Sequence, residues 1–164
     1  MDTTPTRRLP LALAIAAGVV VLDQGTKLWA VRTLTDHAPI PVLGDFLQFR
    51  LLYNPGAAFS MGVNATWVFA IVAAVVAGWL LWAVAHPQPK ARLIGFSLLL
   101  GGATTHLGDR LFRAPGFARG HVVDFIDYNG WFVGNVADIA LFCGAVWIVL
   151  FGLQVPEPKK ATDT

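Results

Sequence analysis

Long apolar stretches dominate the chain and alternate with shorter polar segments. A helix needs roughly 20 mostly apolar residues to cross a bilayer core of about 30 Å. Four stretches come close to that length: Leu11–Val31, Trp67–Ala85, Leu93–Phe112 and Val136–Leu153. The first begins like a signal peptide, but Lys27 and Trp29 resemble an interfacial helix end, so we predict an uncleaved anchor. The pattern predicts an all-α membrane protein with four transmembrane helices.

A different pattern fills the segment between the first two stretches, residues 33–64. Here "PIPVLGDFLQFRLLYNPGAAFS" places β-branched and aromatic residues between proline, glycine and asparagine, a composition that indicates short strands. We expect a small β-rich cradle on the outer face of the helices. Residues 113–134, rich in glycine and aromatics, are expected to lie along the membrane surface. Together these segments form a single integral membrane domain, residues 1–164.

Composition agrees with a membrane protein and excludes several other classes. Hydrophobic residues make up 55% of the chain and charged residues 13%, far from the balance of soluble domains. The net charge of +2 is too small to indicate nucleic-acid binding. The single cysteine, Cys143, excludes an intrachain disulfide and is expected to be a packed thiol. The histidines are dispersed and there is no HExxH or GxSxG motif, so neither a metal site nor a serine hydrolase is expected.

Positive charges give the orientation only weakly. An even number of spans puts both termini on one side of the membrane, and positive-inside counting should identify that side. The basic residues divide almost equally: Arg7, Arg8, Lys90, Arg92, Lys159 and Lys160 lie on the proposed inner side, and Arg32, Arg50, Arg113 and Arg119 on the outer side, with Lys27 and Arg110 at span ends. The inner residues lie in short segments close to the spans, and seven of the ten acidic residues fall on the other side. We therefore predict cytoplasmic termini.

Four carboxylates that are far apart in sequence fall toward the same outer leaflet: Asp23, Asp109, Asp124 and Asp138. Acidic residues in membrane segments are costly and usually pair with a cation or serve a function. Local pairing is open for two of them, because Asp23 lies four residues before Lys27 and Asp109 lies near Arg110 and Arg113. Asp124 and Asp138 have no basic residue three or four positions away. They are the stronger candidates for chemistry.

Two carboxylates that face each other across a partly dry pocket share a proton and titrate as a pair. One then acts as a general base and the other as a general acid, which is the chemistry of an aspartic hydrolase. From composition alone, a proton-coupled transporter or channel is equally compatible with such carboxylates.

Several ordered motifs resemble one family. They are "LDQGTK" at Leu22–Lys27, "YNPGAAFS" at Tyr53–Ser60, "GGATTHLGDR" at Gly101–Arg110, "HVVDF" at His121–Phe125 and "NVADI" at Asn135–Ile139. Over nearly the whole chain they resemble lipoprotein signal peptidase, or signal peptidase II, the membrane aspartic peptidase of bacteria. The resemblance implies a four-helix enzyme with an outer β-cradle in the cytoplasmic (inner) membrane, with both termini cytoplasmic and the active site toward the outer leaflet.

The resemblance also implies a reaction and a set of site residues. The family removes signal peptides from prolipoproteins, before a cysteine that already carries diacylglyceryl, without cofactor or metal. Its substrates and the membrane lipids would be the partners, and nucleic acid would not. By motif, the catalytic residues are Asp124 and Asp138. The substrate-binding or supporting positions are Asp23, Lys27, Asn54, Gly56, His106, Asp109, Arg110 and Asn135. The rival functions are a small proton-coupled transporter and a catalytically silent binder of lipidated peptides.

Some positions have local interpretations or depart from the family pattern. Asn54 precedes Pro55 and is a turn former, and Asn135 is placed to cap the last helix. The family usually has glycine and asparagine where this chain has Thr105 and His106, and an aromatic residue at Gly134; the connection from Asp124 to Asp138 is also short. His106 lies one turn before Asp109 on the same helix face and should point toward the acids. It is either a packed neutral histidine or a donor that replaces the amide.

Overall fold

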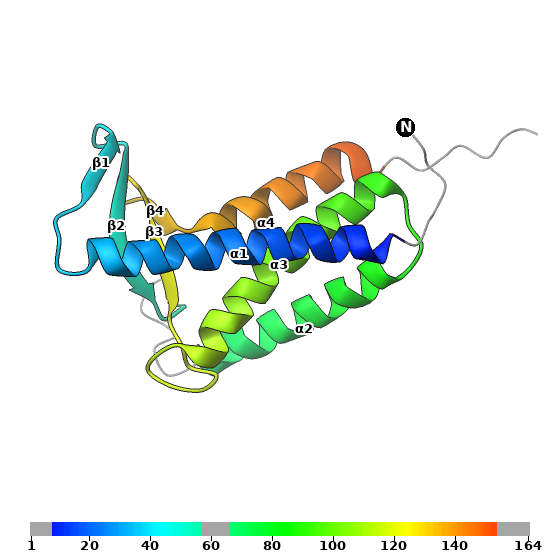
Figure 1. Cartoon of the computed structure of the whole chain (residues 1–164), viewed down its shortest axis with the longest axis horizontal. Coiled ribbons are helices and arrows are strands. Elements are labelled where there is room, and N and C mark those ends of the chain that lie inside the picture. The colour runs from blue at the N-terminus through cyan, green and yellow to red at the C-terminus, as the bar shows by residue number, and fades with distance from the viewer. Residues whose placement is uncertain (1–7, 57–65, 154–164) are drawn as a thin grey trace, which may run out of the picture.

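A computed structural model of the chain describes residues 8–56 and 66–153. Its helices are α1 (Leu9–Leu34), α2 (Thr66–Ala85), α3 (Lys90–Phe112) and α4 (Val136–Trp147), the last continuing into the π-helical turn η1 (Ile148–Gly152). The strands are β1 (Ile40–Leu43), β2 (Leu47–Asn54), β3 (Val122–Tyr128) and β4 (Phe132–Gly134). The helices form an elongated bundle with the sheet at one end, as Figure 1 shows.

Each of the four predicted apolar stretches is a helix within a few residues of its predicted bounds. Two of them, α1 and α2, are long and apolar enough to cross a membrane by themselves. α3 is less apolar because it carries charged residues at both ends, and α4 with η1 is shorter, covering Val136–Gly152. The helices are therefore confirmed, whereas a crossing by all four stays a prediction.

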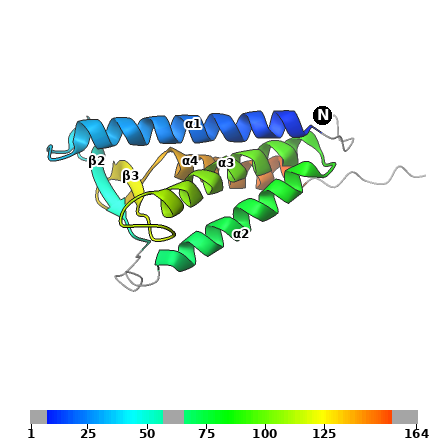
Figure 2. The ribbon, with the colours of Figure 1, turned by 60° about the horizontal axis from the view of Figure 1, so that its bottom comes forward.

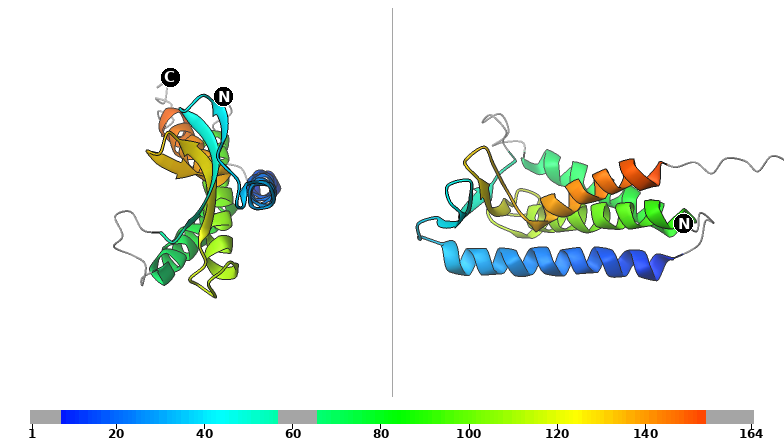
Figure 3. Two further views of the ribbon diagram at one scale, coloured as in Figure 1. Left: turned by 90° about the vertical axis from the view of Figure 1, so that its left-hand side faces the viewer. Right: turned by 90° about the horizontal axis from the view of Figure 1, so that it is seen from above.

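α3 is the central helix of the bundle, and α1, α2 and α4 all pack against it. Two adjacent glycines permit this close approach. A Cβ atom on Gly101 would lie 2.6 Å from the Cβ of Val19 on α1, and one on Gly102 would lie 2.7 Å from Leu141 on α4. Any side chain at either position would push a neighbouring helix away. Seen from the sheet end, α1 stands apart from α2, with α3 between them (Figure 3).

The outer surfaces of the helices are apolar. Val75 on α2 and Phe142 on α4 are 66% and 71% exposed, and many neighbours are similar. A soluble domain does not expose so much contiguous apolar surface, which is what contact with lipid tails requires. Cys143 lies on this exposed surface of α4, so the prediction of a packed thiol is wrong. The helix turns its small residues, Ala140 and Gly144, inward instead.

The sheet is antiparallel with strand order β1-β2-β3-β4. β1 and β2 are the strands predicted in residues 33–64, of which residues 57–64 lie outside the described part. β3 and β4 correct the prediction for residues 113–134: instead of lying along the surface, this segment supplies two strands, and β3 is almost entirely buried. β3 runs between β2 and β4, so its backbone is paired on both sides. Figure 2 shows β2 and β3 beside the end of α1.

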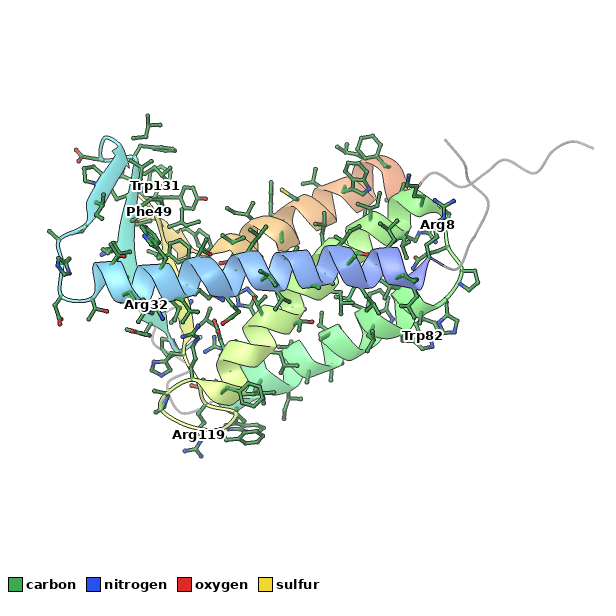
Figure 4. The ribbon with its side chains drawn as sticks, viewed as in Figure 1. Arg8, Arg32, Phe49, Trp82, Arg119 and Trp131 are labelled. Carbon is green, nitrogen blue, oxygen red and sulfur yellow. The ribbon has the colours of Figure 1, made fainter. Side chains whose placement is uncertain are left out.

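An aromatic cluster joins the sheet to the end of α1. The Trp29 ring packs edge-on against Phe49 of β2 at 5.2 Å and against Phe125 of β3 at 6.1 Å. Phe49, labelled in Figure 4, lies beside the last turns of α1. Because edge-to-face pairs add to the burial of apolar area, the cluster fixes β3 against the bundle. Asp124, which precedes Phe125 on β3, is thereby held at the sheet end of the helices.

Candidate active site

Asp124 lies on β3 and is 2% exposed. Its Oδ1 accepts a hydrogen bond from Asn135 Nδ2 at 2.6 Å, and its Oδ2 accepts one from Asn54 Nδ2 at 2.9 Å. Both amides are oriented by further bonds, because Asn54 Oδ1 accepts from the backbone of Gly56 and Asn135 Oδ1 from the backbone of Asp138. Asp124 therefore receives one N–H on each carboxylate oxygen.

Asp138 lies in the first turn of α4, and Asn135 is the residue that caps this helix. The backbone N–H of Asn135 donates to Asp138 Oδ2 at 2.9 Å, while the Asn135 side chain accepts from the Asp138 backbone at 3.2 Å. This reciprocal capping box satisfies two amide hydrogens at the helix start. The capping interpretation of Asn135 is confirmed. The same side chain also donates to Asp124, so one residue contacts both candidate catalytic carboxylates.

The ring of His106 points at the acids, as its helix position predicts. Its Nε2 lies 3.2 Å from Asp138 Oδ1, with the two side chains 21% and 30% exposed. The alternative of a ring hydrogen-bonded to a backbone carbonyl does not describe this nitrogen. When the imidazole is protonated, the contact is an ion pair. When the imidazole is neutral, the contact is a hydrogen bond in which either the Nε2–H donates to the carboxylate or a protonated carboxyl donates to Nε2.

Burial raises the pKa of the Asp124 carboxyl above its ordinary value, because the charged form loses its hydration. The hydrogen bond from Asn54 lowers that pKa, the negative charge of Asp138 raises it, and the Asn135 bond and the charge of His106 lower it. Burial prevails over the opposing contacts. Asp124 therefore keeps a proton to a higher pH than an exposed aspartate.

A second polar cluster lies between α1 and α3, inside the bundle. The Nζ atom of Lys27 is 2.7 Å from Asp23 Oδ2 and 2.7 Å from Asp109 Oδ2, and all three side chains are at most 1% exposed. Arg113 Nε lies 2.6 Å from the other oxygen of Asp109, and Gln24 links Asp109 to Arg113. The Asp23–Lys27 pair considered from the sequence is present. Asp109 pairs with Arg113 and Lys27 rather than with Arg110.

This cluster also holds the backbone next to each candidate catalytic residue. Asp23 Oδ1 accepts from the backbone N–H of Ala137, which precedes Asp138, at 2.9 Å. Asp109 Oδ2 accepts from the backbone N–H of Val123, which precedes Asp124, at 3.4 Å. Lys27 connects the two carboxylates, so it ties the start of α4 to β3. Through these contacts the buried charges fix the backbone beside Asp124 and Asp138.

Arg110 fixes the end of β2. Its Nη1 donates to the carbonyl of Asn54 at 2.9 Å and to the carbonyl of Gly120 at 3.0 Å. Its guanidinium lies 5.6 Å from the centre of the Phe69 ring on α2, a cation–π contact. Gly56 has φ +95 and a Cβ there would lie 2.6 Å from the same ring, so only glycine fits. These contacts hold Asn54 where its amide reaches Asp124.

Apolar surfaces flank the two carboxylates. A groove of about 640 Å³ runs past Asp138 and Asn135 and is lined by Tyr128, Phe132, Ile139 and Phe142. A Cβ on Gly134 would lie 2.6 Å from the Phe132 ring and 2.9 Å from Asp138 Oδ2. The glycine thus lets Phe132 lie close to Asp138, in space that a side chain at position 134 would take. A second cavity of about 260 Å³ lies on the side of His106 and Arg110, against Phe69 and Leu141.

The sequence predicted the polar members of the site but not these lining residues. Within residues 8–56 and 66–153, the structure contains no group of three or more histidine, cysteine, aspartate or glutamate side chains arranged to hold a metal ion. The side chains that gather here are two carboxyls, two amides and an imidazole, beside an apolar groove. This arrangement suits acid–base catalysis on a substrate with a large apolar part.

A solved bacterial membrane enzyme has the same fold. It superposes with a TM-score of 0.78 and 26% sequence identity, over 94% of this chain and 98% of its own. The fold and the apolar helix surfaces together define the class: an integral membrane enzyme.

The sequence comparisons specify the family. The model of signal peptidase (SPase) II matches residues 15–154. The lipoprotein signal peptidase of Mycobacterium avium is 42% identical over 166 residues, 98% of this chain and 91% of the relative. That of Mycolicibacterium smegmatis is 45% identical over 149 residues, which are 91% of this chain and 63% of the longer relative. The chain belongs to the signal peptidase II family, and the resemblance found in its motifs is confirmed.

Proposed function

We propose that Asp124 and Asp138 are the catalytic pair with which this signal peptidase II removes signal peptides from diacylglyceryl-modified prolipoproteins, cleaving before the lipidated cysteine. The observation that carries the proposal is the double role of Asn135. Its side chain donates to Asp124 and its backbone N–H to Asp138. The two carboxylates are thus held on one rigid support beside an apolar groove.

The proposed reaction uses one water and no covalent intermediate. The ionised carboxylate of Asp138, which is 30% exposed, takes a proton from the water as its oxygen attacks the scissile carbonyl carbon. Asp124 carries the proton of the pair, in keeping with its raised pKa, and gives it to the carbonyl oxygen. Collapse of the resulting diol breaks the C–N bond: protonated Asp138 gives its proton to the leaving amine nitrogen, and ionised Asp124 takes a proton from a diol hydroxyl as the carboxylic acid product forms. The two aspartates then share one proton again.

A cleavage assay tests the proposed function. Purified protein in mild detergent is mixed with a signal-peptide substrate whose cysteine carries diacylglyceryl, and with the same peptide bearing an unmodified cysteine. We expect a shortened product that begins at the cysteine from the lipidated peptide only. Binding of the lipidated peptide without a product would favour the silent binder. Neither binding nor cleavage, together with proton uptake in vesicles, would favour the transporter.

We place all four helices across the bacterial cytoplasmic membrane, with both termini inside and the sheet outside. The polar side chains of α3 and α4 face the buried clusters, so these helices still offer apolar surfaces to lipid. The described chain begins and ends at the helix end farthest from the sheet (Figure 1). In this placement the pair lies toward the outer leaflet, where a lipid-anchored substrate presents its cleavage point.

Thiol labelling checks the orientation. In a Cys143→Ala background, a cysteine replaces exposed Asp45 before β2 or exposed Lys90 at the start of α3. We expect an impermeant thiol reagent to label the Asp45→Cys protein in cells with a permeabilised outer envelope. The Lys90→Cys protein should react only after the inner membrane is opened. The reverse pattern would overturn the proposed topology.

His106→Asn should keep the enzyme active and shift its pH dependence. The cation that a protonated His106 places beside the carboxyl pair favours the ionised state of the pair, so with an uncharged amide the pair loses its first proton at a higher pH. Activity requires an ionised member of the pair, so the acid limb of the pH–rate profile should move upward. His121→Asn, outside the pair, is the control. An unchanged acid limb in active His106→Asn protein would contradict the role given to this ring.

A further inference from the structure

A second pocket with polar and aromatic walls lies at the end of the bundle opposite the sheet. Its volume is about 520 Å³, and it lies between the end of α2, the beginning of α3 and η1. The side chains that matter for its chemistry are Trp79, Trp82, His86, Arg92 and Phe96. In Figure 4, Trp82 and Arg8 mark this end, far from Arg32 and the sheet. The catalytic pair makes no use of this pocket.

This end of the described chain has basic residues and no carboxylate. Lys90 and Arg92 belong to the start of α3 here. The acidic residues within residues 8–56 and 66–153 all lie nearer the sheet: Asp23, Asp36, Asp45, Asp109, Asp124, Asp127 and Asp138. Within the part of the chain that the structure describes, the pocket therefore lies in a region of positive charge. Such a region attracts anionic headgroups at a membrane surface.

Arg92 is held in place at the edge of the pocket. Its Nε and Nη2 donate to the carbonyl of Gly152 at 3.2 and 3.0 Å. Among the described residues, its Nη1 has no acceptor, so an N–H remains for a ligand. α3 begins at Lys90, and its N-cap Pro89 supplies no side-chain hydrogen bond. The first amide hydrogens of α3 thus add a partial positive charge at the same end of the bundle.

Most of the rest of the pocket wall is aromatic or aliphatic and suits acyl chains. Trp79 packs edge-on against Phe96 at 5.5 Å, and the Trp82 ring lies 4.4 Å from the His86 ring at an interplanar angle of 41°. Trp82 is nevertheless 59% exposed, so its ring is available to a further apolar partner. A small soluble anion has no apolar part that could contact these rings. A ligand that joins a phosphate to hydrocarbon chains would contact both parts of the pocket.

We propose that this pocket binds one anionic phospholipid. Its phosphodiester contacts Arg92 Nη1 and the start of α3, and its acyl chains lie against Trp79 and Trp82. The site is separate from the peptidase chemistry and rests on the proposed placement across the membrane, in which it belongs to the inner leaflet. There the lipid fastens the α2–α3 turn to η1, because Arg92 contacts both the lipid and the end of η1.

Native mass spectrometry of the protein released from neutral detergent tests the site. The probes are phosphatidylglycerol and phosphatidylcholine with identical acyl chains, each titrated separately. We expect tighter binding of phosphatidylglycerol, and Arg92→Gln should weaken it about fivefold, the change that corresponds to about 1 kcal/mol. Arg32→Gln, a matched loss of charge on the exposed sheet end of α1, should leave the affinity unchanged. Prolipoprotein cleavage in detergent should be unaffected by Arg92→Gln, which separates this test from that of the active site.

A second variant protects the test from a folding defect in Arg92→Gln, which also loses the bonds to Gly152. Trp82→Ala lies on the exposed wall and should weaken both lipids equally, without changing the preference for phosphatidylglycerol. Equal affinity of the parent for both lipids would overturn the proposal, as would wild-type affinity in both variants. An equal loss in Arg32→Gln would show general charge attraction. Displacement of the lipid by millimolar inorganic phosphate would show a soluble-anion site instead.

Discussion

Asp124→Asn and Asp138→Asn should each lower the rate of prolipoprotein cleavage by roughly a thousandfold or more while substrate binding persists. Positioned acid–base groups typically contribute 10²–10⁴-fold, and residues that act as a unit lose most of that when either is replaced. An amide keeps the volume of the carboxyl and one of its two accepting oxygens, so the groove beside Asp138 retains its shape. Turnover and binding of the lipidated peptide are measured on the same purified protein.

The same strand offers a matched control. Asp127 also lies on β3 and is 5% exposed, but its carboxylate pairs with Arg50 at 2.8 Å and accepts from the backbone of Gly130. Asp127→Asn should therefore reduce stability slightly and leave cleavage nearly intact. Asp109→Asn should impair folding or activity only in part, because Asp109 belongs to the second polar cluster, where it pairs with Lys27 and Arg113. A folded but inactive Asp109→Asn protein beside an active Asp124→Asn protein would overturn the assignment of the pair.

The helices leave a local signal in the sequence, whereas most polar members of the candidate site were proposed from motif resemblance. Apolar stretches of nearly bilayer length gave the helices within a few residues. The capping role of Asn135 followed from its position three residues before Asp138, a spacing that a helix start uses directly. Motif resemblance supplied the family, which the comparisons confirm.

The β3–β4 hairpin was missed although the sequence contains its signal. Asn129 and Gly130 have φ 55 and 74, the positive values that a tight hairpin turn needs. This Asn-Gly pair stands between the β-rich stretches of β3 and β4. The aspartates of β3 argued against predicting a strand here, because two aspartates in seven residues are unusual in a buried strand. With β3 read as a surface segment, Tyr128 and Phe132 could not be recognised as the wall of the groove.

The ion pair between different helices could not be predicted from residue spacing along the sequence. Helical spacing suggests partners three or four residues apart, and it gives the Asp23–Lys27 and Asp109–Arg113 pairs. The contact between Lys27 and Asp109 joins α1 to α3 and depends on how the helices pack. Arg110 is adjacent to Asp109 in sequence yet lies on a different face of α3, where backbone carbonyls satisfy it. Only the tertiary arrangement decides between these partners.

Lys27→Met should cause the largest loss of stability among single replacements outside the pair. The buried cluster balances two carboxylates, Asp23 and Asp109, against the cations of Lys27 and Arg113. Removing Lys27 leaves Asp109 with Arg113 but leaves the buried Asp23 without a cation, with only two neutral donors, the backbone N–H of Ala137 and the side-chain amide of Gln24. Removal of one partner from a buried ion pair costs about 3–5 kcal/mol. For a chain of this size we expect the midpoint of thermal unfolding in detergent to fall by on the order of 10 °C.

The charge imbalance, and not the lost methylene packing, is the expected cause, so a second replacement should repair it. Lys27→Met combined with Asp23→Asn leaves Asp109 and Arg113 as a neutral pair, and an asparagine at position 23 can still accept from Ala137 through its side-chain oxygen. The double variant should therefore unfold at a higher temperature than Lys27→Met alone. Because Asp23 and Asp109 also hold the backbone before Asp138 and Asp124, part of the cleavage rate should return with the stability. If the double variant is as unstable as Lys27→Met, or less stable, then Lys27 contributes by packing, and the electrostatic account of this cluster is wrong.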